Sequence, residues 1–311
     1  MVLAVVVALG AMAQADAALS HFWVGRGYYN PAAAGEFNAI HLTLGSRMQW
    51  VDFRRAPMNF FLTADMPRKV LGQRLGLGVR AEYERIGLFT DTRIGAQIAY
   101  KRKFGRNLTV SVGVQPGVFS QTFRGDEALK PGSSEPDQGI PEGTVSGTAF
   151  DANAGVFVSH PKFWAGLSVT HVTAPGIEIK AGRDAQEVFE FKASRGYNFM
   201  AGGNIPINNT LFEIQPSGMF YMAEKAWTAQ VATVVRYNRM LNIGAGYRWK
   251  DAVTAFIGVN LKDAYIGYSY DYPTSAISRA TFGSHEVFVT YNVKLNNDEK
   301  NKNKQKSIRL M

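Results

Sequence analysis

Ser284, His285 and Glu286 are consecutive and combine a hydroxyl, an imidazole and a carboxylate, the side-chain types of a serine hydrolase. The residues that follow them are apolar at every second position, which is typical of a β-strand, and neighbouring side chains on a strand point to opposite faces. The three groups therefore cannot meet at one substrate without partners from other strands. A hydrolase at the rim of the fold remains only an alternative, and we expect a structural contact of His285 with Glu286 or Asp271.

No other pattern in the chain indicates catalysis or cofactor binding. The sequence contains no phosphate loop, dinucleotide fingerprint, HExxH or GxSxG motif. It has no cysteine, which excludes disulfides, thiolate ligands and thiol nucleophiles. The five histidines form no i, i+2 or i, i+4 pair suited to a metal; they are His21, His41, His160, His171 and His285. We predict a non-enzymatic protein with no catalytic residue, no metal and no cofactor.

The composition of the 311 residues fits a chain that buries much of itself. Apolar residues make up 46% and charged residues 19%, below the roughly 25% usual for soluble domains. Beyond the first 15 residues no apolar run approaches the length of a spanning helix, whereas alternating strands of a membrane barrel remain possible. The net charge of +9 is compatible with anionic lipopolysaccharide, an acidic cargo or simple solubility, and nothing indicates nucleic acid.

Hydrophobic alternation with a period of two dominates the chain. From Leu75 to Tyr83 the odd positions are apolar, while Arg80 and Glu82 lie on the other face. We predict an all-β fold, a transmembrane antiparallel up-and-down β-barrel of about 14 strands. The expected strands are 41–50, 59–65, 75–83, 93–101, 108–118, 150–158, 164–171, 197–205, 211–220, 227–237, 241–249, 253–261, 264–271 and 285–295.

The lengths of the connections support this order of strands. If the mature N-terminus is periplasmic, turns after even-numbered strands are periplasmic and short. The two longest connections, Phe119–Ala149 and Val172–Gly196, both follow odd-numbered strands. Residues 120–148 are rich in Gly, Pro and acidic residues and show no period, so we expect a solvated outer loop, either a recognition element or a tolerated insertion.

Aromatic residues occur where a membrane barrel needs them. Trp227 and Tyr237 share the apolar face of one strand, and ten residues of tilted strand span roughly 25 Å, the height of the apolar band. Trp50, Tyr83, Tyr100 and Trp249 also lie at predicted strand ends. The alternative is a soluble barrel or sandwich with these rings in its core.

Paired glycines, Gly76 with Gly78 and Gly244 with Gly246, are expected to make room for bulky neighbours or for curvature.

The two ends of the chain differ from the predicted barrel at 41–295. Residues 1–13 resemble a signal peptide without its basic start, the alternative being a core helix. Residues 14–40 are expected to form a periplasmic or lumenal segment, with a bend where Asn30 and Pro31 precede Gly35. Residues 296–311 are predicted to form a basic disordered tail. With a periplasmic mature N-terminus and an even number of strands, both termini are expected in the periplasm.

Several segments together resemble the PorP/SprF family, outer-membrane proteins of the type IX secretion system of Bacteroidetes. They are LSHFWVGRGYYNPAAAG at 19–35, Met48-Gln49-Trp50, the stretch from Ala56-Pro57 to Asp65-Met66-Pro67, GLSVTHVTAP at 166–175, and GYSYDYPTSAISRATFGSHEVFVTYNVKL at 267–295. Departures from the family pattern fall at residues 14–16 and 20–22, and loop 119–149 has no match. The structural or docking candidates carried by these motifs are Tyr29, Asn30, Pro31, Gly35, Gln49, Trp50, Pro57, Tyr268, Tyr270, Asp271, Gly283, His285 and Glu286.

The resemblance implies a component of protein secretion and gliding motility that docks or anchors cargo such as adhesins at the outer membrane. It implies as partners the outer-membrane lipid, the ring and motor components of the secretion system, and the secreted cargo proteins. The alternative function is a channel for small hydrophobic or polar solutes, since barrels of this size can conduct if they are unplugged.

Overall fold

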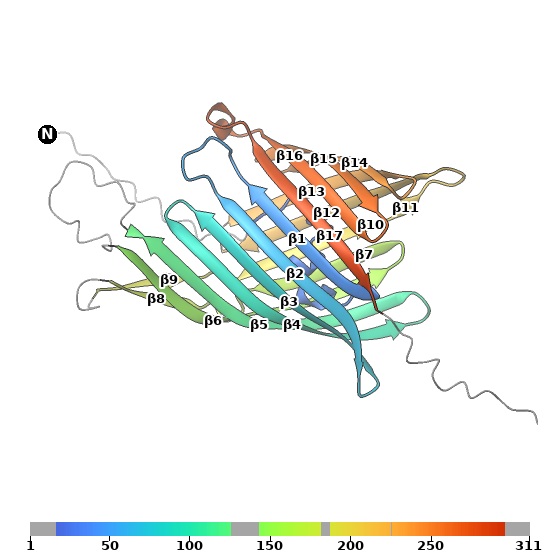
Figure 1. The fold of residues 1–311 in the computed structure, drawn as a ribbon, viewed down its shortest axis with the longest axis horizontal. Helices are drawn as coiled ribbons and strands as arrows, with labels where there is room; N and C mark the ends of the chain where they lie inside the picture. Colours follow the sequence, from blue (N-terminus) through green and yellow to red (C-terminus); the bar gives the residue numbers. More distant parts are fainter. Residues whose placement is uncertain (1–16, 126–142, 182–186, 225, 296–311) are drawn as a thin grey trace, which may run out of the picture.

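The computed structural model describes residues 17–125, 143–181, 187–224 and 226–295 (Figure 1). The predicted signal peptide, the predicted tail 296–311 and most of the predicted outer loop lie outside these residues. Among the described residues, no helix has the length and apolar character needed to cross a membrane.

Fourteen antiparallel strands close into a barrel, as predicted. Each strand pairs with its neighbour along the chain, and the pairing of β1 with β17 closes the cylinder, so no sheet edge is left unpaired in the wall. The wall consists of β1 (Ala39–Met48), β2 (Met58–Val70), β3 (Gln73–Ile86), β4 (Phe89–Phe104), β5 (Leu108–Arg124), β6 (Thr144–His160), β7 (Phe163–Thr170), β10 (Gly196–Gly203), β12 (Phe212–Ala223), β13 (Ala226–Tyr237), β14 (Leu241–Arg248), β15 (Ala252–Leu261), β16 (Ala264–Pro273) and β17 (Ser284–Lys294).

Two connections differ from the prediction. The predicted loop 120–148 is shorter, because β5 continues to Arg124 and β6 already begins at Thr144. The predicted loop after β7 contains a hairpin, β8 (Gly176–Ala181) with β9 (Glu187–Lys192), which forms a separate two-stranded sheet. Ile177 of this hairpin is fully buried against Phe119 on the inner face of β5, so the hairpin packs against the wall at that end of β5 and β6. A short strand β11 (Ile205–Pro206) pairs with β12.

The two faces of the wall have opposite polarity, as the alternation predicted. On β3, Val79 is 51% exposed on the outside while the adjacent Arg80 is 4% exposed inside. Trp227 and Tyr237 both point outward from β13 with apolar residues between them. An apolar exterior around a buried polar interior is the arrangement of a barrel that has lipid as its outer solvent, and it excludes the soluble alternative with aromatics in the core.

The two ends of the barrel differ in their connections. At one end, here called the short-turn end, the strands are joined by turns no longer than residues 204–211. At the other, the long-loop end, lie the connections 49–57, 125–143, 171–195 and 274–283. Leu295 follows β17 at the short-turn end, which is also where β1 begins.

Residues 17–38, here called the lumen segment, run through the inside of the barrel. They contain α1 (Arg26–Tyr29) and the 3-10 helix η1 (Pro31–Ala33). The carbonyl of Ala18 accepts from Arg248 at the long-loop end of β14, and Gly35 contacts Asp65 in the half of β2 nearer the short turns. The described chain therefore enters at the long-loop end and leaves at the short-turn end. The segment before β1 therefore takes the lumenal one of the two positions expected for it. The expected periplasmic location of both termini concerns residues outside the described ones and stays a prediction.

Candidate functional site

The lumen segment is shaped by its own local sequence. Asn30 has an extended backbone, and its side-chain oxygen accepts a hydrogen bond from the Ala32 N–H at 2.9 Å, which caps η1. Pro31 occupies the first position of η1, where the missing N–H costs nothing. Gly35 has φ +68°, a conformation that favours glycine, and ends the bend. The bend predicted at residues 30–35 is thus present.

Asn30 also fixes the bend to the wall. Its side-chain amide donates to the carbonyls of Val156 on β6 and Leu167 on β7, at 2.9 and 3.1 Å. The Asn30 side chain is fully buried, so these bonds satisfy a polar group that would otherwise be costly to bury. Nearby, the hydroxyl of Ser168 donates to the carbonyl of Tyr29 at 2.8 Å. The bend is therefore part of the barrel interior and not a loosely held insert.

Glycines on the inner face of the wall make room for the lumen segment backbone. A Cβ at Gly76 would lie 1.9 Å from the carbonyl oxygen of Ala34, and one at Gly113 would lie 2.5 Å from the nitrogen of Ala32. At Gly155 it would lie 2.3 Å from the Asn30 side chain. The expectation that paired strand glycines admit bulky neighbours is confirmed for Gly76, and the neighbour is the chain's own backbone.

The start of the lumen segment is held by a cluster of buried charges, here called the anchor cluster: Ser20, His21, Arg47, Arg248, Asp271 and Glu286. Glu286 accepts hydrogen bonds from the backbone N–H groups of Ser20 and His21, both at 2.7 Å, and lies 2.8 Å from His21 Nδ1. Asp271 accepts from the Ser20 hydroxyl at 2.8 Å. Each carboxylate thus binds the lumen segment directly.

Two arginines balance the two carboxylates of the anchor cluster. Arg47 on β1 bridges them, with Nη2 2.6 Å from Asp271 and Nη1 3.3 Å from Glu286. Arg248 on β14 contacts Asp271 at 3.2 Å and donates to the Ser20 hydroxyl at 2.9 Å. All six side chains are almost fully buried. Because a buried charge without its partner is strongly destabilising, removal of any one member should release the others.

A second polar cluster receives the middle of the lumen segment. The hydroxyl of Tyr28 donates to Glu82 on β3, which also accepts from Asn59 at 2.7 Å and pairs with Arg80 at 2.5 Å. The Arg80 guanidinium lies 4.0 Å from the centre of the Tyr28 ring.

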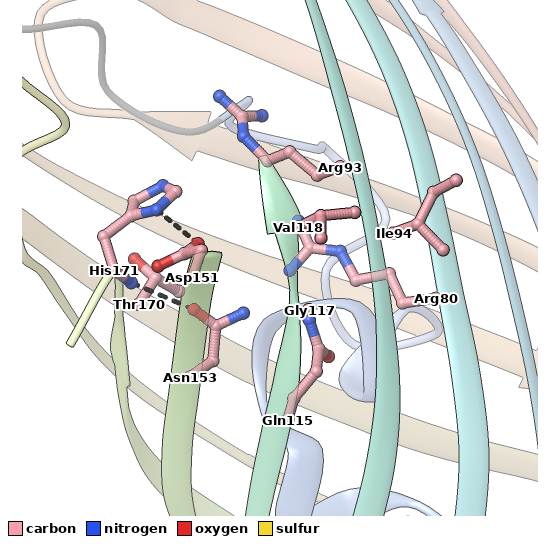
Figure 2. Close-up of a pocket in the computed structure, with 10 residues that line it drawn as sticks. All are labelled: Arg80, Arg93, Ile94, Gln115, Gly117, Val118, Asp151, Asn153, Thr170 and His171. Carbon is pink, nitrogen blue, oxygen red and sulfur yellow. Dashed lines mark hydrogen bonds and ion pairs between the residues drawn. The ribbon is translucent and has the colours of Figure 1, made fainter. Parts of the chain in front are cut away.

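Beyond this cluster, towards the long loops, polar side chains of β3 to β7 face one another across a small pocket (Figure 2). Asp151, Asn153 and His171 lie on one side and Arg80 on the other. His171 Nδ1 lies 2.7 Å from Asp151, and its backbone N–H donates to Asn153 at 2.9 Å. The pocket volume of about 10 Å³ admits about one water molecule, so it is a packed polar network with no room for a ligand.

The other motif residues build the rim at the long-loop end. Residues 49–57 and 274–283, here called the rim platform, are joined by hydrogen bonds from the Val51 N–H to the Gly283 carbonyl at 2.8 Å and from the Thr281 hydroxyl to the Val51 carbonyl at 2.7 Å. Gln49 donates its N–H to the Pro57 carbonyl at 2.9 Å. Trp50 donates its N–H to the Ser284 hydroxyl at 3.1 Å.

Tyr270 and Gly283 complete this platform. The Tyr270 hydroxyl donates to the Phe282 carbonyl at 2.7 Å. Gly283 has φ +97°, and a Cβ there would lie 2.5 Å from the carbonyl oxygen of Asp271, so only glycine fits. Apart from Tyr268 and His285, the motif candidates therefore gather at two places, the lumen segment with its anchor cluster and the rim platform.

The expected contact of His285 with Glu286 or Asp271 is wrong. His285 points outward and its Nδ1 lies 2.6 Å from the Tyr268 hydroxyl, whereas Ser284 and Glu286 point inward. The partner of Glu286 is His21 of the lumen segment. The alternation of the strand separates these neighbours, so Ser284, His285 and Glu286 do not form a hydrolase site. Within the described residues no group of three or more His, Asp or Glu side chains could hold a metal ion.

A family profile described as "Type IX secretion system membrane protein PorP/SprF" matches residues 11–291. The chain belongs to the PorP/SprF family. Among curated proteins nothing matches. The fold is similar to solved outer-membrane barrels, among them the CymD monoaromatic hydrocarbon channel (12% identity, 87% of this chain and 93% of that chain, TM-score 0.47), a Pseudomonas aeruginosa FadL homologue (12%, 85% and 92%, 0.47) and Acinetobacter baumannii Omp33 (7%, 82% and 98%, 0.44).

In this PorP/SprF chain the sequence motifs identified only part of the anchor cluster. Asp271 and Glu286 were among the candidates, and Arg248 lies within the predicted strand 241–249. Arg47, Ser20 and His21 were not singled out, and residues 20–22 depart from the family pattern. The signal that could have found Arg47 is its position on the inner face of β1, two residues beyond Gly45.

Proposed function

We propose that this PorP/SprF protein is a non-enzymatic docking module that holds secreted cargo, such as an adhesin, at the outer membrane. The observation that carries the proposal is that the chain's own residues 17–38 run through the lumen, where the anchor cluster holds them and blocks the barrel towards the long-loop end. A barrel closed in this way is suited to anchoring, because nothing the size of a folded or extended chain can pass through it. Function is then expected at the ends of the barrel.

The rim platform is the surface best suited to cargo. It is fixed by hydrogen bonds between two connections, and it presents Phe53 and Phe282, which are 49% and 74% exposed. Aromatic side chains that a rigid support exposes in the free protein are the type that becomes buried at the centre of a protein interface when a partner binds. With the long-loop end outward, the platform faces the cell surface. The short-turn end, from which the chain continues after Leu295, then faces the ring and motor components in the periplasm.

The test is a double substitution, Phe53→Ser with Phe282→Ser, introduced into the native gene. Cargo secretion and surface display are measured by immunoblotting of cell and medium fractions. The proposal predicts that cargo is lost from the surface while the barrel remains in the outer membrane at its normal level. Phe163→Ser, which changes an outward ring at the short-turn end, is the matched control and should leave display intact. Unchanged display in the double variant would overturn docking at the rim platform.

A solute channel is the competing function, and conductance separates the two. The channel predicts a large, stable open current from the full-length protein in a planar bilayer, whereas a docking module with a filled lumen predicts none. Gliding motility, where the organism glides, would depend on the protein only through delivery of its adhesins.

A further inference from the structure

A cavity of about 340 Å³ lies inside the barrel at the short-turn end, between the lumen segment and the wall from β12 to β17. This cavity, here called the vestibule, has a volume within the 300–1,000 Å³ typical of small-molecule sites. The packed pocket of Figure 2, by contrast, has about 10 Å³. Within the described residues the lumen is therefore filled towards the long-loop end and open at the other.

Aromatic rings form one side of the vestibule. Trp23 of the lumen segment packs edge-on against Phe256, with ring centres 4.7 Å apart. Tyr265 lies against the paired glycines Gly258 and Gly267, where a Cβ would come within 2.6 and 2.5 Å of its hydroxyl oxygen. The two glycines thus let the Tyr265 ring lie against the wall. Such rings offer a flat apolar surface with a polar edge.

Five carboxamides line the same cavity: Asn204, Gln215, Asn242, Asn260 and Asn292. Each carboxamide can donate and accept hydrogen bonds at once, which matches a hydroxyl group better than a charged side chain does. The side-chain oxygen of Asn292 lies 2.7 Å from His41 Nδ1. The Asn260 side chain makes no hydrogen bond with the described residues. Gln215 donates to Asn204 at 3.1 Å, and Asn242 accepts from Arg236 at 3.2 Å. An apolar solute would leave Asn260 without a partner, so a polar ligand suits this part of the lining better.

Most charged side chains that the structure describes around the vestibule have an ion-pair partner, and one lysine does not. Arg26 is held by Glu36 at 2.9 Å and by the rings of Phe37 and Trp164, 5.6 and 5.1 Å from its guanidinium carbon. Arg236 pairs with Glu213 at 3.5 Å, and Asp263 pairs with Lys294 at 3.2 Å. Lys262, in the turn between β15 and β16, has no such partner among the described residues. The vestibule therefore presents a single uncompensated positive charge at its mouth.

From these features we infer that the vestibule binds a saccharide that carries a carboxylate. The C–H face of a sugar ring packs on Trp23 or Tyr265, its hydroxyl and acetamido groups bond the carboxamides, and its carboxylate meets Lys262. The inference is independent of cargo docking at the rim platform, because it concerns the opposite end of the barrel. Acidic sugars of this chemistry occur in the cell wall, as N-acetylmuramic acid, and in the core of lipopolysaccharide.

The test is calorimetric titration of the purified full-length protein in detergent with three probes. They are the disaccharide of N-acetylglucosamine and N-acetylmuramic acid, the neutral dimer of N-acetylglucosamine, and a lipopolysaccharide core oligosaccharide with its acidic sugar. We expect an acidic probe to bind saturably and one-to-one. Its affinity should be about fivefold higher than that of the neutral dimer, because one exposed ion pair contributes a factor of about this size. Preference for the disaccharide assigns the cell wall as the source, and preference for the core oligosaccharide assigns lipopolysaccharide.

Two variants test the site itself. Lys262→Gln should lower the affinity for the acidic probes about fivefold and leave the affinity for the neutral dimer unchanged. Lys250→Gln is the matched control, since Lys250 is also a turn lysine with positive φ but lies at the long-loop end. Ser217→Phe should fill the cavity and abolish binding of every probe. Absence of saturable binding, equal affinity for neutral and acidic probes, or unaltered affinity in Lys262→Gln would each overturn the inference.

Discussion

Glu286→Gln should loosen the lumen segment without disturbing the outer face of the barrel. In the structure Glu286 accepts from two backbone N–H groups at 2.7 Å, contacts His21 Nδ1 at 2.8 Å and pairs with Arg47 at 3.3 Å. A glutamine of the same shape removes the charge and turns one acceptor into a donor that faces other donors. Each charge-assisted bond contributes about 1.5–3 kcal/mol, and breaking a buried charge network costs about 3–5 kcal/mol.

A loss of about 3 kcal/mol corresponds to roughly a hundredfold change in an equilibrium constant. Native-state hydrogen exchange, read by mass spectrometry on peptides covering residues 19–29, should therefore show protection reduced by about that factor, because local opening becomes more frequent. His285→Gln is the matched control, since the adjacent side chain points outward and contacts Tyr268 and the Tyr270 ring, not the lumen segment. Equal protection in Glu286→Gln and the native protein, with the barrel still folded, would refute the assignment of Glu286 as an anchor.

Three further perturbations test other parts of the structure. Gly76→Ala should displace the lumen segment and lower the free energy of unfolding by about 1–3 kcal/mol, as overpacking does, whereas Gly218→Ala, with no neighbour closer than 3.8 Å, should have little effect in the same urea titration. Val231→Arg, on the lipid face midway along β13, should lower the free energy of unfolding in lipid vesicles by about 2–4 kcal/mol. A decrease below about 1 kcal/mol would place residue 231 outside the apolar band. Because the chain has no cysteine, single variants Ala17→Cys and Leu295→Cys can each be labelled with an impermeant maleimide. Ala17→Cys should react in intact cells, and Leu295→Cys only after lysis. Labelling of both variants from the same side would contradict the path through the lumen.

The strands and their faces were predictable because each depends on local alternation. Arg80 and Glu82 could be placed inside and Val79 outside from their neighbours alone. Strand ends were less predictable: β5 and β6 extend past the predicted ends because pairing between them continues as far as Arg124 with Thr144. That pairing is a contact between distant residues, which composition does not reveal.

The lumen segment could not be derived from periodicity, because it has none. Its position depends on inward polar groups of β1, β3, β16 and β17 that are brought together only by closure of the barrel. The same reason explains the wrong partner expected for His285. Adjacent residues in the sequence were taken as a pair, whereas Glu286 is paired with His21, which lies 265 residues away in the chain.

The most direct test of the closed, anchored barrel is single-channel recording in planar bilayers of the full-length protein beside a variant that lacks residues 17–34. The account predicts no stable current from the full-length protein, because the lumen segment fills the bore, and long-lived openings from the shortened variant. A large stable current through the full-length protein, or the absence of current from both proteins, would contradict the account.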